Sequence, residues 1–306
     1  MYKTFLFAMV CGLGIVACGK STDTVATTNS APPSPSSVST TVPAGATLVA
    51  EEDIATQTDT AYSLDWSADG EALAVASGVE VTRLSKDLSE RIAVFQPTGG
   101  ALDASWSPLG SLATVGGLRN SSIEVWDWKS ATGTPTRERM VSADSDQYAV
   151  SWSPDGTRLA TLADDRTSSI QIWDTSSWTL VQQFDLPYAN PRRALNWSVD
   201  GQTINDAGES NGHVVYFSLN VTDGSVEELG VLPTEDAHAV TFSPDLQQIA
   251  VAAENGEVQV IAVEPGNVLA DFQSVNTPVD LAWNPKNATL AILAYDTTLQ
   301  LWSIPM

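Results

Sequence analysis

The sequence predicts an all-β fold built from six similar units. The clearest unit runs from Tyr148 to Asp174 and reads YAVSWSPDGTRLATLADDRTSSIQIWD. Apolar and polar residues alternate around Trp152 and again at residues 170–173, as half-buried strands require. Between them, the segment Ser153 to Gly156 has Pro second and Gly fourth, which favours a tight turn before a second strand that starts at residues 159–162. The unit therefore predicts three antiparallel strands.

Five further copies of this aromatic-and-turn pattern occur along the chain, at steps of 40–46 residues. Their aromatic residues, with that of the first unit, are Trp66, Trp106, Trp152, Trp197, Phe242 and Trp283. A period of about 40–45 residues with four strands per repeat is typical of a β-propeller. We therefore predict a six-bladed β-propeller of four-stranded antiparallel blades, with a seven-bladed or open ring as the alternative. We expect the tryptophans to pack between blades rather than to stack on a ligand.

The third predicted strand of three repeats carries a second signature. It reads IEVWD at 123–127, IQIWD at 170–174 and LQLWS at 299–303, and it resembles the W-D signature of the WD40 family over residues 47–306. The resemblance implies a propeller that binds other proteins through its loops. In the other three repeats, Thr82, Phe217 and Ile261 stand near the place of the second aromatic residue. We do not extend the resemblance to the family's His-Ser/Thr-Trp hydrogen-bond network, because no Gly-His dipeptide precedes the first strand of a repeat.

The N-terminal residues 1–17 are predicted to be a signal peptide. One lysine precedes an apolar run of about 14 residues from Thr4 to Ala17, which is too short to span a bilayer. The sequence Ile-Val-Ala-Cys at 15–18 resembles the lipobox of bacterial lipoproteins, and the resemblance implies that Cys18 becomes the lipidated N-terminus. An ordinary secretory peptide is the alternative.

Residues 18–46 are predicted to be the lipidated cysteine and a disordered tether. This stretch is rich in Ser, Thr, Ala and Pro and lacks apolar periodicity, so it buries too little surface to offset its ordering entropy. The membrane would be reached through the N-terminal lipid alone. By analogy with proteobacterial lipoprotein sorting, Gly19 favours the outer membrane, on its periplasmic or extracellular side.

The segment near residues 47–55 is expected to close the ring. The sixth repeat ends at Met306 directly after its third strand, so a complete last blade needs a strand from elsewhere. Closure by the two ends of the chain removes an exposed sheet edge.

Catalytic and metal-binding patterns are weak. The two histidines, His213 and His238, fall in different repeats, and no serine lies in a nucleophile-elbow context. The acidic pairs at 144–146 and 164–165 lack the spacing of an EF-hand loop. We therefore predict no catalytic residues, no bound metal and no cofactor.

The charge balance excludes nucleic acid as a partner. The chain has 14 basic and 37 acidic residues, a net charge of −23, which repels a phosphate backbone. The few cations are nevertheless predicted to gather with two tyrosines on one face, in loops that lead into first strands or join second to third strands. The residues of this predicted face are Arg119, Arg166, Arg192, Arg193, Tyr148 and Tyr188. Arg and Tyr are enriched at interaction hot spots. The alternative is that these arginines are scattered and solvated and pair with Asp164, Asp165 or Glu209.

Two functions remain open at this stage. The first is a monomeric, non-catalytic interaction scaffold that is tethered to a bacterial membrane and binds a protein partner in the cell envelope. The second is a propeller enzyme, or a sugar- or peptide-binding protein, that uses the mouth of the central channel, with or without a metal. The fold hosts both classes. Several carboxylates directed into the channel mouth would favour the second.

Overall fold

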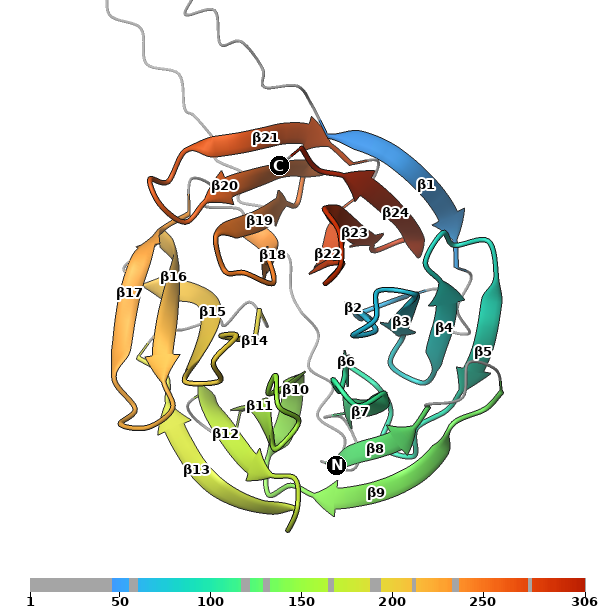
Figure 1. Cartoon of the computed structure of the whole chain (residues 1–306), viewed down its shortest axis with the longest axis vertical. Coiled ribbons are helices and arrows are strands. Elements are labelled where there is room, and N and C mark those ends of the chain that lie inside the picture. Colours follow the sequence, from blue (N-terminus) through green and yellow to red (C-terminus); the bar gives the residue numbers. More distant parts are fainter. Residues whose placement is uncertain are drawn as a thin grey trace, which may run out of the picture. The chain divides into compact units, whose positions relative to one another are not determined.

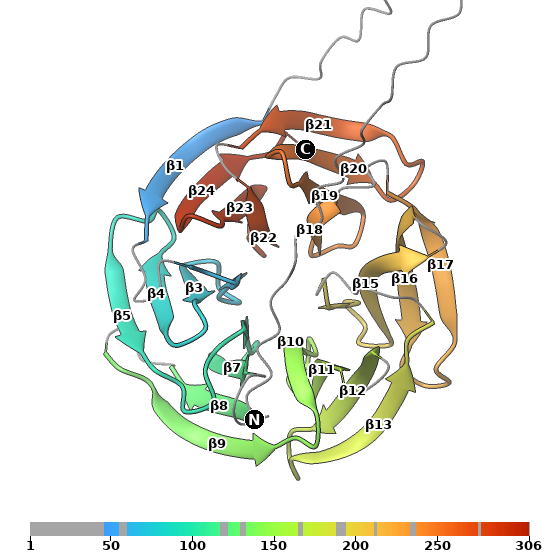
Figure 2. The same ribbon diagram turned by 180° about the vertical axis from the view of Figure 1, so that it is seen from behind.

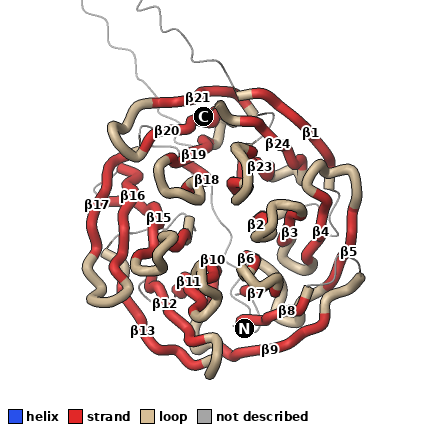
Figure 3. Tube along the Cα trace, viewed as in Figure 1, coloured by secondary structure: helices blue, strands red, loops and turns tan. Residues whose placement is uncertain are grey.

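The described part of the chain consists of strands, turns and loops. The computed structural model describes residues 46–54, 60–116, 122–128, 133–164, 168–187, 194–210, 213–232, 237–274 and 277–305. Within these ranges 24 strands form six four-stranded antiparallel sheets, which Figure 3 shows as a ring without helices. No helix in this part is long and apolar enough to cross a membrane. The prediction of an all-β, six-bladed propeller is confirmed.

The strands of each blade follow one another from the central channel to the outer rim (Figures 1 and 2). Blade 1 contains β2 (Ser63–Trp66), β3 (Ala72–Ala76), β4 (Val81–Ser85) and β5 (Arg91–Phe95). Blade 2 contains β6 (Asp103–Trp106), β7 (Ser111–Gly116), β8 (Ser122–Asp127) and β9 (Thr136–Ser142). Blade 3 contains β10 (Asp146–Trp152), β11 (Arg158–Asp164), β12 (Ser168–Asp174) and β13 (Thr179–Asp185).

The remaining blades repeat this order, with one exception at the closure. Blade 4 contains β14 (Asn196–Trp197), β15 (Thr203–Ser210), β16 (His213–Asn220) and β17 (Val226–Val231). Blade 5 contains β18 (Ala237–Phe242), β19 (Gln248–Ala253), β20 (Glu257–Ala262) and β21 (Val268–Gln273). Blade 6 contains β22 (Pro278–Trp283), β23 (Thr289–Ala294), β24 (Thr298–Ser303) and β1 (Thr47–Asp53).

The ring is closed by β1, which comes from the other end of the described chain. It pairs antiparallel with β24, from Thr47 opposite Ser303 to Asp53 opposite Thr298. Beyond the last pair, the Thr297 hydroxyl donates a hydrogen bond to Asp53 Oδ1 at 2.8 Å. The predicted closing strand is therefore confirmed, and blade 6 has no unpaired third strand that could recruit another chain.

The hydrophobic core lies between blades rather than inside one compact centre. Six buried clusters occur, one at each blade boundary. The aromatic residue that ends each innermost strand joins one of these clusters, and all are buried except Trp152, which is half-buried. The prediction that the repeated tryptophans pack between blades is confirmed.

The predicted positions of the second aromatic residue are correct only in part. Strand pairing places Trp126 opposite Leu112, and the residues paired in the same way in the other blades are Leu84 opposite Leu73, Leu219 opposite Ile204, and Ile261 opposite Ile249. Ile261 was predicted correctly. Thr82 and Phe217 lie two residues too early, because the hairpins between second and third strands differ in length.

Candidate functional site

A cavity of about 220 Å³ lies on the central channel. Its wall is built by the innermost strand of each blade or by the residues directly before that strand, so all six blades contribute. The charged side chains that line it are Asp65 on β2, Asp103 on β6 and Asp280 on β22. These carboxylates come from the adjacent blades 6, 1 and 2, and all three are half-buried.

Two of these aspartates hold the first strand of the next blade through the same position in the repeat. Asp280 Oδ2 accepts the Leu64 N–H at 2.8 Å, and Asp103 Oδ2 accepts the Val150 N–H at 2.7 Å. In each pair the aspartate lies three residues before the aromatic residue that ends its own strand. The N–H group lies two residues before the aromatic residue that ends the first strand of the next blade. Ser63 takes this place in blade 1, where its Oγ accepts the Ala104 N–H at 3.2 Å.

Asp65 makes the corresponding contact from the position directly before the aromatic residue. Its Oδ2 accepts the Trp106 N–H at 2.7 Å, and Ser105 in blade 2 makes a longer contact of this kind to Trp152 N–H, at 3.4 Å. An innermost strand has a neighbour in its own sheet on one side only, so its free edge presents backbone N–H groups that need partners. The channel carboxylates supply these partners across blade boundaries.

The other half of the channel wall lacks these side chains. The position three before the aromatic residue is occupied by Ala149, Ala194 and Ala239 in blades 3, 4 and 5, and all three are buried. An alanine side chain cannot accept a hydrogen bond. The wall of the cavity is therefore acidic on one side and uncharged on the other, where Ser151, Asn196 and Thr241 line it.

Burial changes the ionisation of the channel acids. Loss of solvent contact, with a smaller contribution from the charge of Asp103, raises the pKa of Asp65 from 3.8 to about 7, although the bonds from Trp106 and Trp66 act in the opposite direction. Burial, again with the charge of Asp103, raises the pKa of Asp280 well above 3.8. A carboxyl group that titrates near neutral pH can hold or release a proton under physiological conditions.

The described residues offer no obvious metal centre, since no group of three or more His, Cys, Asp or Glu side chains among them is arranged to hold an ion. His213 and His238 are both exposed and lie in different blades, at the start of β16 and near the start of β18. His213, which follows Gly212 in the sequence, begins the third strand of blade 4, so this Gly-His dipeptide does not precede a first strand.

Most of the predicted partner-binding face lies outside the described residues. This holds for Arg119, Arg166, Arg192, Arg193 and Tyr188, and also for Cys18. Tyr148 is described: it is half-buried on β10, where the pairing with β11 shifts between Gln147 and Ala149. The arginine face and the lipid anchor therefore stay predictions.

One set of contacts was missed by sequence reasoning. Trp126 Nε1 donates to Thr114 Oγ1 at 3.3 Å in blade 2, and Trp173 Nε1 donates to Thr161 Oγ1 at 3.0 Å in blade 3. These bonds join third strands to second strands within blades 2 and 3. The signal in the sequence was a threonine twelve residues before each tryptophan.

Comparison with known proteins agrees with this geometry. The family model "WD domain, G-beta repeat" matches residues 135–174, which span β9 and the first three strands of blade 3. The chain is also similar to the β-propeller domain of Cps50 (Swd1) from Myceliophteria thermophila, with 15% sequence identity and a TM-score of 0.56 over 80% of this chain and 83% of that one. The chain thus contains a recognisable WD40 repeat within a β-propeller fold.

Proposed function

We propose that this chain is a non-catalytic protein-interaction scaffold, tethered to a membrane of the bacterial cell envelope through Cys18, and that its propeller binds a protein partner through a loop face. The observation that carries the proposal is the use of the channel acids. Asp65, Asp103 and Asp280 each accept a backbone N–H from the next blade, so the polar groups of the channel serve to join blades. The surface that remains for recognition is the pair of loop faces.

The similarity to WD40 repeats and to a β-propeller supports the same function, because propellers of this family bind proteins. The scaffold model also fits the net charge of −23, which discourages contact with anionic lipid and nucleic acid. In this proposal the lipid alone holds the protein at the outer membrane, on its periplasmic or extracellular side.

The partner-binding role is tested by affinity capture from detergent-solubilised envelope membranes, with a tag after Met306. The matched variant reverses four charges, Arg119→Glu, Arg166→Glu, Arg192→Glu and Arg193→Glu. We expect one defined protein to be captured by the native chain and lost by the variant. Equal capture by both would remove the arginine face from the proposal, and no captured protein in either sample would contradict the scaffold role.

The anchor is tested separately with Cys18→Ser. We expect this change to abolish labelling by a radioactive fatty acid and to move the protein from the membrane fraction to the soluble fraction. An unlabelled native chain would contradict the lipoprotein proposal without affecting the scaffold proposal.

A second candidate function rests on the acidic side of the channel. Three carboxylates line a cavity of about 220 Å³ and one has a pKa of about 7, which suits a small-ligand site or an acid–base group. A thermal-shift screen with metal ions, sugars and short peptides tests it against Asp65→Asn. Stabilisation of the native chain alone would favour the channel function, whereas the scaffold proposal predicts none.

A further inference from the structure

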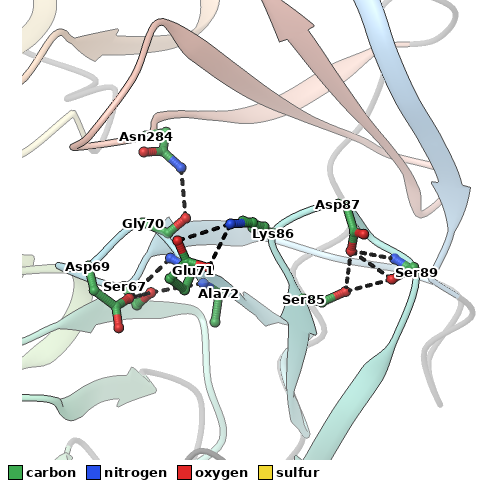
Figure 4. Close-up of polar contacts among 10 residues, drawn as sticks. All are labelled: Ser67, Asp69, Gly70, Glu71, Ala72, Ser85, Lys86, Asp87, Ser89 and Asn284. Atoms are coloured by element: carbon green, nitrogen blue, oxygen red, sulfur yellow. Dashed lines mark hydrogen bonds and ion pairs between the residues drawn. The ribbon is translucent and has the colours of Figure 1, made fainter.

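The turns that join first to second strands form a continuous surface on one face of the ring. Figure 4 shows the pattern in blade 1, where Gly70 contacts Asn284 of blade 6. On the other side of the ring, a Cβ added at Gly156 would lie 3.4 Å from Pro108 and 3.5 Å from Leu109. A Cβ added at Gly201 would lie 3.9 Å from Pro154. The turns of blades 2, 3 and 4 therefore lie next to one another.

Four of the turns share a stabilising side-chain pair that blades 2 and 6 lack. The serine hydroxyl at the first position donates to an aspartate at the third position, at 2.6–2.7 Å. The residues of these four pairs are Ser67–Asp69, Ser153–Asp155, Ser198–Asp200 and Ser243–Asp245. Blade 2 has Leu109 at the third position, and its side chain is 69% exposed. The turn of blade 2 therefore lacks the Ser–Asp hydrogen bond and exposes an apolar side chain to solvent.

Blade 4 departs from the pattern at the second position. Val199 stands where four other turns have Pro, and its side chain is 71% exposed. Val199 and Leu109 are the two most exposed large apolar side chains among the described residues. Departures from a local rule without a structural benefit are expected at functional positions.

These residues form one surface, which we call the apolar turn strip: Pro108, Leu109, Pro154 and Val199. Contacts at Gly156 connect its blade 2 and blade 3 parts. Between Pro154 and Val199 lies a hollow of about 180 Å³, whose wall is completed by Asp155, Asp200 and Gly201. A single apolar side chain of a partner fits a hollow of this kind.

The surroundings of the strip are acidic. Hydrogen bonds from Ser153 and Ser198 lower the pKa values of Asp155 and Asp200, so both are ionised at neutral pH. The nearby cation, Arg158, is already engaged: its Nη2 donates to Gly201 O at 2.7 Å, and its guanidinium lies 4.9 Å from the Trp197 ring centre. The strip therefore combines an apolar centre with a negative rim.

We propose that the apolar turn strip binds a segment of a partner protein that carries Leu-like side chains flanked by Lys or Arg. Charge complementarity selects this occupant. A second copy of the chain or an anionic lipid surface would bring like charges together, given the net charge of −23. The inference rests on the proposed interaction function, but it concerns a different set of loops from the predicted arginine face.

A random peptide library displayed on phage provides the test, with selection on the native propeller and counter-selection on Leu109→Asp/Val199→Pro. This double variant restores the turn residues of the sister blades, so we expect it to fold with an unchanged or raised melting temperature. Selected peptides should combine apolar and basic residues, and a synthetic copy should bind the variant about tenfold or more weakly than the native chain.

The matched control is Val231→Thr, which changes an apolar side chain that is 54% exposed on the outer strand β17 and should leave peptide binding unchanged. Three outcomes would contradict the proposed role of the strip. They are selection of no peptide, selection of acidic peptides, and equal binding of a peptide to the native chain and the double variant. The fourfold arginine variant described above should bind these peptides normally. If the double variant loses peptide binding and the fourfold arginine variant keeps it, the peptides bind the strip and not the arginine face.

Discussion

The two halves of the channel wall join their blades by different means. Between blades 6, 1, 2 and 3, side chains at one repeated position accept N–H groups of the next blade: Asp280, Ser63 and Asp103. Blades 3, 4 and 5 have alanine at that position. The apolar clusters are present at all six boundaries, so they suffice to build the ring. The carboxylates are an addition that makes one half of the ring sensitive to pH.

The largest expected effect comes from removing one of these links. Asp103→Ala leaves the Val150 N–H and the Ser63 hydroxyl without their acceptor, and each lost bond to a buried group costs about 1–3 kcal/mol. We expect the free energy of unfolding, measured by urea denaturation at pH 5, to fall by about 2–4 kcal/mol.

The matched control for this prediction lies in the alanine half. Val231→Thr, at an exposed site on β17 of blade 4, should change the stability by less than about 0.5 kcal/mol. An Asp103→Ala variant as stable as the native chain would mean that the channel hydrogen bonds contribute little and that the two halves are energetically alike.

The second prediction concerns pH. The folded-state pKa of Asp65, about 7, lies above its ordinary value of 3.8, so the folded chain binds this proton more tightly than the unfolded chain does. The stabilisation that protonated Asp65 contributes is fully present below about pH 4 and is lost as the pH rises towards 7. Because the side chain of Asp65 is half-buried beside the channel cavity, we expect a loss of about 1–3 kcal/mol between pH 5 and pH 8.

Urea denaturation across this pH range measures the effect. Asp65→Asn removes this titrating group and should reduce the loss of stability, with the remainder contributed by Asp280, whose pKa is also raised. Asp155→Asn is the control, because hydrogen bonds from Ser153 and Thr157 lower the pKa of Asp155, whose contribution changes only in more acidic solution. A native profile that is flat, or that rises from pH 5 to pH 8, would show that the channel acids are stabilised in their ionised form.

The sequence predicted the ring far better than the channel. The spacing of Trp66, Trp152 and their counterparts specified six blades, because one aromatic residue per blade is needed to fill each boundary. The need for a fourth strand in blade 6 specified β1. Both features follow from the repeat itself, and local alternation and turn residues agree with them.

The channel aspartates escaped sequence reasoning because they are single residues in separate repeats. Asp65 and Asp280 lie 215 positions apart in the chain and come together only through ring closure. The sequence analysis considered the acidic pairs at 144–146 and 164–165 instead, but acidic residues that are close in sequence need not lie in the channel. Alignment of the six innermost strands on their aromatic residues would have revealed the shared position of Asp103 and Asp280.

The smallest effect is expected at the boundary between blades 3 and 4, in the alanine half. There Arg158 of β11 covers the Trp197 ring and donates to Gly201 O, and Trp197 Nε1 donates to Ser151 O at 3.1 Å. Arg158→Met keeps an apolar stem but removes both interactions of the guanidinium. We expect a loss of about 1 kcal/mol in the free energy of unfolding, together with faster hydrogen exchange at the Gly201 amide, which is bonded to Ser198 O.

Arg139→Met, at an exposed site on β9, is the control and should leave both measurements unchanged. If Arg158→Met also changes neither, the two Arg158 interactions contribute little to this boundary, and the contrast between the two halves of the ring becomes sharper.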